Sequence, residues 1–144
     1  MFKHILLATD GSASAEHAAQ RTMDLAHIHG AHVTAAYVVD PYPYIGIGEV
    51  NPMAFQSYMS AAQEASTRAF THLADLAAAA GVPLQVQLVE NMQAARGIVQ
   101  LADEVAADLI VIGSHGRSGV EKLVLGSVAA KVVAQSSRPV LVIR

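Results

Sequence analysis

Residues 108–128, "DLIVIGSHGRSGVEKLVLGSV", decide the fold. The apolar run Asp108–Gly113 is short and ends in glycine, which is typical of a buried parallel strand. Residues 127–135 predict a helix after a segment rich in glycine and serine. Glycine at this density costs backbone entropy, so the local geometry must require it.

The same alternation of strand and helix extends in both directions from this segment. Further strands are predicted at Phe2–Thr9, Ala31–Val39, Leu84–Glu90 and Arg138–Arg144. Helices are predicted from a cap at Ser12 or Ser14 to Gly30, over Ala54–Ala80, and over Gln93–Ala106. Residues Asp40–Pro52 carry prolines and glycines, which predict a loop. The pattern favours an α/β fold, a doubly wound, five-stranded, mostly parallel sheet with helices on both faces, in one domain spanning residues 1–144.

Composition excludes several classes of function. The net charge of −3 and pI near 6.1 give no electrostatic case for binding nucleic acid or an anionic membrane. The chain has no cysteine, which excludes disulfides, thiol catalysis and cysteine-ligated zinc. The first apolar run breaks at Asp10, too early for a signal peptide, and no run approaches the ~20 apolar residues of a membrane span. A soluble cytoplasmic protein is expected.

Polar or glycine residues follow three predicted strands where each ends. These are Thr9–Gly11, Val39–Asp40 and Gly113–Gly116, and they should converge if the first and fourth strands are neighbours. A glycine segment that leads into a helix N-terminus can hold an anion, with Arg117 or Lys122 adding positive charge. The segment matches neither a Walker A loop nor G-x-G-x-x-G, so the residues alone leave turn formation as an equal alternative.

The longer spacing G-x-x-G-x9-G-[S/T], formed by Gly113, Gly116, Gly126 and Ser127, resembles the nucleotide motif of the universal stress protein family. The stretches "ILLATDGSASAEHAA", "AAYVVD" and "SSRPVLVIR" are similar to its first, second and closing strands. The resemblance covers the whole chain. It implies an adenine nucleotide alpha hydrolase-like, Rossmann-like fold.

The resemblance also implies site residues. Asp10 would lie near the adenosine with Ala8 and Thr9 beside it, and the backbone of Val38 would read the adenine edge. The segment around ribose and phosphates would comprise Ile112, Gly113, Ser114, His115, Gly116, Arg117, Gly126, Ser127 and Val128. The implied ligand is ATP, or AMP or ADP, with Mg²⁺ held through the phosphates. Relatives often carry Ser or Thr where this chain has Ala129, which removes one hydroxyl worth ~1 kcal/mol.

The resulting prediction is an adenine-nucleotide-binding protein of stress response or signalling. It is expected to be a homodimer paired through its last strand, with Val140 and Val142 near the two-fold axis. A slow ATP hydrolase and a nucleotide-free protein acting through protein contacts are the alternatives.

No residue is assigned to catalysis or to a metal. His115 has no acidic partner at fixed spacing, and His27, His29 and His32 straddle a helix end and a strand start. Asp10 has a second interpretation, as the cap of the turn that follows the first strand.

Overall fold

The sheet has five strands in the order β3-β2-β1-β4-β5, and every pairing within it is parallel. The structure is a computed structural model that describes residues 1–40, 52–116 and 124–144. Its strands are β1 His4–Thr9, β2 His32–Val39, β3 Leu84–Glu90, β4 Leu109–Gly113 and β5 Val140–Ile143. Its helices are α1 Ala13–His29, α3 Pro52–Ala80, α4 Ala94–Glu104 and α5 Ser127–Gln135. The predicted fold class is therefore confirmed.

The central strand β1 pairs with β2 on one side and β4 on the other. Its register places Ala8 opposite Ala36 and Ile112. The first and fourth strands are neighbours, as the convergence of their polar ends requires. The carboxyl ends of β1, β2 and β4 consequently meet at one edge of the sheet.

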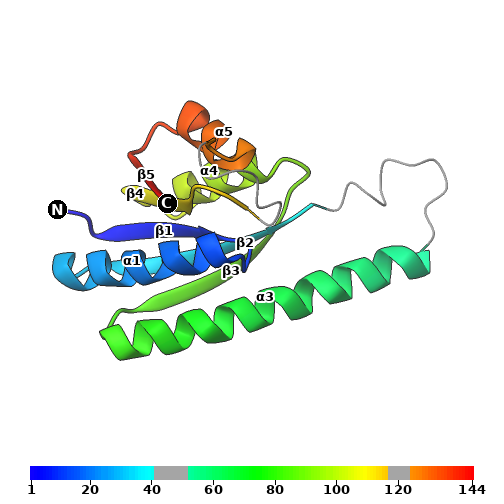
Figure 1. Cartoon of the computed structure of the whole chain (residues 1–144), viewed down its shortest axis with the longest axis horizontal. Coiled ribbons are helices and arrows are strands. Elements are labelled where there is room, and N and C mark those ends of the chain that lie inside the picture. Colours follow the sequence, from blue (N-terminus) through cyan, green and yellow to red (C-terminus); the bar gives the residue numbers. More distant parts are fainter. Residues whose placement is uncertain (41–51, 117–123) are drawn as a thin grey trace.

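Helices cover both faces of the sheet (Figure 1), and each face has its own cluster of buried apolar side chains. Helices α1 and α3 pack on one face, where Ile5, Leu7 and Met23 are fully buried. Helices α4 and α5 pack on the other face, over Leu6, Ile110 and Val132. Side chains at odd positions of β1 therefore pack on one face of the sheet and those at even positions pack on the other. Because both faces are buried, the sequence of β1 is a continuous apolar run.

The element ends differ from prediction by a few residues. The first strand begins at His4 and not Phe2, because Lys3 N–H donates to Asp108 Oδ2 instead of joining a ladder. The last strand begins at Val140 because Arg138 N–H donates to Ser136 Oγ. Helix α3 begins at Pro52, which was placed in the loop; proline is favoured at a first helical position because its missing N–H is not needed there. The rest of that predicted loop, 41–51, lies outside the described residues.

Helix α1 begins and ends as its sequence signals indicate. Ser12 is the cap, and its Oγ accepts from Ala15 N–H at 3.2 Å. Gly30 ends the helix in the left-handed region with φ 62°, which glycine adopts without strain. Across the described residues, no helix is both long and apolar enough to cross a membrane.

Candidate functional site

A cavity of about 140 Å³ lies where β1, β2 and β4 end, on the face covered by α4 and α5. It brings together twelve of the thirteen predicted site residues. They are Ala8, Thr9, Asp10, Val38, Ile112, Gly113, Ser114, His115, Gly116, Gly126, Ser127 and Val128. The thirteenth, Arg117, lies outside the described residues, as does Lys122.

Ser114 fixes the start of α5 against the end of β4. Its N–H donates to Ile143 O at 2.7 Å, and its carbonyl accepts from Gly126 N–H at 2.7 Å. The first bond continues the β4–β5 ladder by one residue, and the second attaches the cap of α5 to it. A backbone hydrogen bond therefore holds the cap of α5 at the cavity.

Close approach, not turn conformation, explains two of the glycines. A Cβ on Gly126 would lie 2.8 Å from Ser114 O, and one on Gly113 would lie 2.7 Å from Ser14 Oγ. Neither glycine has a positive φ, unlike Gly11 and Gly30. A positive φ is therefore not what requires glycine at these two positions, whereas the choice between turn formation and an anion site stays open.

The N-terminus of α5 presents backbone donors to the cavity. Its cap Gly126 accepts from Ala130 N–H at 2.9 Å, so the amides of residues 127–129 precede the first intrahelical bond. Such amides, with the positive end of the helix dipole, favour an anion. Ala129 is 2% exposed and packs with Ile112 and Val132, so this position of α5 contributes no hydroxyl.

Asp10 has the role predicted for it in the turn after the first strand, and it also lines the cavity. One carboxylate oxygen, Oδ1, accepts from Ser12 N–H at 2.9 Å and so supports the turn before α1. The other, Oδ2, lies 3.1 Å from where a Cβ of Gly116 would stand. The carboxylate thus joins the turn to the glycine segment at the cavity wall.

The rest of the wall is apolar. Ala8, Val38 and Ile112 come from three adjacent strands, and Ala94 and Ile98 come from α4. Tyr37 is the last β2 residue paired with β1, so Val38 lies beyond that ladder. A flat apolar ring fits such surroundings better than a charged group does.

Sequence reasoning missed Ser14 and the contribution of α4. His115 N–H donates to Ser14 Oγ at 3.4 Å, across 101 positions of sequence, while His115 Nδ1 lies 2.7 Å from Ser114 Oγ. The sequence predicts for Ser14 only the role of a helix cap. The apolar face of α4 was predicted, but nothing in the sequence said that it closes this cavity.

The three histidines considered for metal binding have separate neighbours. His27 Nδ1 lies 2.8 Å from Ala80 O, the His29 ring contacts Phe2, and the His32 ring stacks on that of His4. Burial, followed by His32, lowers the pKa of His4, whose Nε2 lies 2.7 Å from Thr34 Oγ1. This pair lies at the amino ends of the strands, away from the cavity.

Comparisons with known proteins agree with this architecture. A universal stress protein of Thermus aquaticus is 38% identical over 145 residues, covering 100% of both chains. The structure of protein MJ0577 superposes with a TM-score of 0.87 at 24% identity, covering 99% of this chain and 96% of that one. A universal stress protein solved in complex with cAMP has a TM-score of 0.69 at 28% identity, covering 99% of this chain and 97% of that one. The model of the universal stress protein family matches residues 1–144, and the chain belongs to this family.

Proposed function

We propose that this protein binds an adenine nucleotide, ATP or its products ADP and AMP, and acts in stress response or signalling as a single cytoplasmic domain. The observation that carries the proposal is the convergence of three features on one cavity: the N-terminus of α5, the Asp10 carboxylate, and an apolar wall ending at Val38. The complex of a relative with cAMP supports an adenine nucleotide as the ligand class.

Each feature matches a part of the ligand. The adenine would lie against Ala8, Val38 and Ile112, and the Asp10 carboxylate would accept from ribose hydroxyls. The amides at the start of α5 and the Ser127 hydroxyl would donate to phosphate. The volume of about 140 Å³ is below the ~300 Å³ of typical drug-sized sites, so the phosphates would extend out of the cavity.

The donor set also suits Mg²⁺ bound through the nucleotide. Asp10 is the one carboxylate among the described lining residues, too few for an all-protein cage. The ion would therefore be held mainly by phosphate oxygens and would neutralise their charge. The chain's own contribution is to bind the phosphates at neutral backbone donors.

Isothermal titration calorimetry with ATP, ADP and AMP, with and without Mg²⁺, tests this proposal. We expect micromolar dissociation constants, about −8 kcal/mol. Ser127→Ala should weaken the binding of ATP about fivefold, because one hydrogen bond is lost. Ser60→Ala, on the exposed side of α3, should leave ATP binding unchanged. The absence of both binding heat and a thermal shift at millimolar nucleotide would refute the proposal. Mass spectrometry of ligand released from fresh protein then identifies the nucleotide, and an ADP-release assay tests slow hydrolysis.

We also propose a homodimer formed through β5, which is an edge strand. Ser114 N–H and Ile110 N–H donate to Ile143 O and Pro139 O, so by alternation the backbone of Val140 and Val142 is directed away from β4. Proline is tolerated where an edge N–H faces outward. Val142→Pro should give a monomer by light scattering, whereas Val86→Pro on the opposite edge strand should leave the dimer. A monomeric native protein at micromolar concentration would overturn the assignment.

A further inference from the structure

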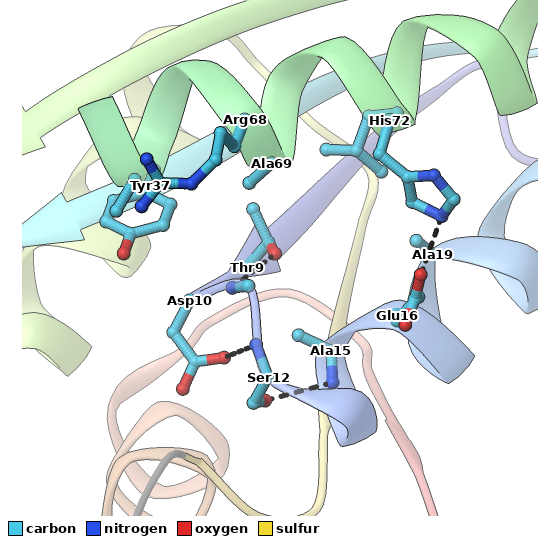
Figure 2. A pocket seen from close by; sticks show the side chains of 13 residues that line it. Thr9, Asp10, Ser12, Ala15, Glu16, Ala19, Tyr37, Arg68, Ala69 and His72 are labelled. Carbon is cyan, nitrogen blue, oxygen red and sulfur yellow. Dashed lines mark hydrogen bonds and ion pairs between the residues drawn. The ribbon is translucent and has the colours of Figure 1, made fainter. Parts of the chain in front are cut away.

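A second and larger cavity, of about 460 Å³, lies on the opposite face of the sheet from the proposed nucleotide site (Figure 2). Its walls are the first half of α1, the middle of α3, and the ends of β1 and β2. The volume is within the ~300–1,000 Å³ range of small-molecule sites. It shares Thr9, Asp10 and Ala15 with the first cavity, which otherwise has different walls.

A guanidinium on one helical wall lies across the cavity from carboxylates on the other. Arg68 and His72 line the cavity from α3, while Glu16 from α1 and Asp10 before it line the other side. His72 Nε2 and Glu16 Oε1 lie 2.8 Å apart and bridge the helices at one end of the cavity. Between the walls the surface is apolar, formed by Ala15, Ala19, Ala65, Ala69 and Leu73.

Arg68 has no ion-pair partner among the residues that the structure describes. Across residues 1–40, 52–116 and 124–144, the ion pairs involve Arg21, Arg138 and His72, and none involves Arg68. Figure 2 shows the Arg68 side chain extending from α3, across the cavity from the turn that carries Asp10. A guanidinium in this position can bind a carboxylate or phosphate with two parallel hydrogen bonds.

A simple anion does not fit the whole cavity. Asp10 and Glu16 give the α1 wall a negative potential that repels an anion and attracts a cation. A ligand with separated charges satisfies both walls, and an apolar body between its ends covers the alanines and Leu73.

We propose that this cavity binds a small zwitterion of amino-acid or dipeptide size, with its acid group at Arg68 and its ammonium group on the side of Asp10 and Glu16. The proposal does not depend on nucleotide binding, since Arg68 and the alanines of α3 do not line the first cavity.

The experiment titrates ¹⁵N-labelled full-length protein with 6-aminohexanoate, followed by two-dimensional NMR. Hexanoate and hexylamine, which each carry one of the two charges, are the matched controls. We expect saturable shifts at amides of α1 and α3, including Glu16 and Ala69, and none at Val128 of α5. Each control should bind at least tenfold more weakly.

Two variants test the walls. Arg68→Gln should weaken the binding of 6-aminohexanoate at least tenfold, so that it binds no more tightly than hexylamine. Arg21→Gln, on α1 and away from the cavity, should leave both affinities unchanged. Ala69→Leu should narrow the cavity and weaken binding, with Ala79→Leu on the exposed side of α3 as its control. The Arg68→Gln variant should bind ATP as the native protein does.

The outcomes separate the two sites. Shifts confined to α5 and the glycine segment, equal binding of hexanoate, or binding unaffected by Arg68→Gln would each overturn the proposal. Failure of ATP to bind the native protein would overturn the nucleotide proposal and leave this one standing.

Discussion

Replacing Gly126 with alanine should damage the α5 N-terminus through a backbone contact. The new Cβ would lie 2.8 Å from Ser114 O and 3.4 Å from His115 Cα. Ser114 O cannot move freely, because Ser114 N–H is itself held by Ile143 O at 2.7 Å. The contact must therefore be relieved by displacing the start of α5.

The size of the effect follows from two contributions. Overpacking a closely packed site costs ~1–3 kcal/mol, and losing the Gly126 N–H to Ser114 O bond costs ~1 kcal/mol. We expect a loss of about 2–3 kcal/mol in the free energy of unfolding, which lowers the Tm by roughly 5–10 °C for a chain of this size. Nucleotide affinity should fall at least tenfold, because the helix amides leave their positions.

Gly116→Ala is the matched control within the same cavity. Its Cβ would meet only Asp10 Oδ2 at 3.1 Å, the end of a side chain that can give way. We expect the free energy of unfolding to change by less than ~0.5 kcal/mol, while the affinity for nucleotide falls. Urea unfolding of both variants measures the loss of stability, and calorimetry measures the loss of nucleotide affinity. Equal stability losses, or a Gly126→Ala protein as stable as the native one, would show that close approach is not what requires glycine at 126.

Three further substitutions test other contacts. Ala129→Ser places a hydroxyl at the cavity wall and should tighten the binding of ATP about fivefold. The binding of adenosine should not change, and calorimetry measures both affinities. Burial lowers the pKa of His4, so the unfolded chain binds more protons and stability falls as the pH is lowered below about 6.5. His4→Gln should flatten this dependence in urea unfolding between pH 7 and 5, whereas His17→Gln at an exposed position should not. Arg138→Met leaves the Ala107 carbonyl without its guanidinium donor and should lower the free energy of unfolding by about 1–2 kcal/mol, seen as an unchanged m-value with a lower midpoint.

The strand order is the part of the fold that local patterns could not supply. Continuous apolar runs indicate strands buried on both faces, but they carry no information about which strand lies beside which. The adjacency of β1 and β4 spans more than 100 positions, as in the pairing of Ile5 with Leu109. Alternating strands and helices predicted the class; only this adjacency makes Asp10 and Gly116 neighbours.

The spacing of the glycines predicted some features of the segment between β4 and α5 and not others. Its composition predicted that the local backbone geometry requires glycine, and the family resemblance predicted a nucleotide. Neither identified the contacts. The atoms that crowd Gly113 belong to Ser14, which is about 100 positions earlier in the sequence, and the atom that crowds Gly126 is the carbonyl oxygen of Ser114. A side chain that crowds a distant glycine leaves no periodic signal.

The zwitterion cavity was not predictable for a related reason. Arg68 and His72 lie on the long helix α3, for which the sequence predicts a helix but no binding residue. Periodicity describes the faces of one helix, whereas this cavity exists between two, where alanines of α1 and α3 face each other. Asp10 lies at both cavities, so substituting it cannot assign a phenotype to either; Ser127 and Arg68, which each line one cavity, are the positions that separate the two functions.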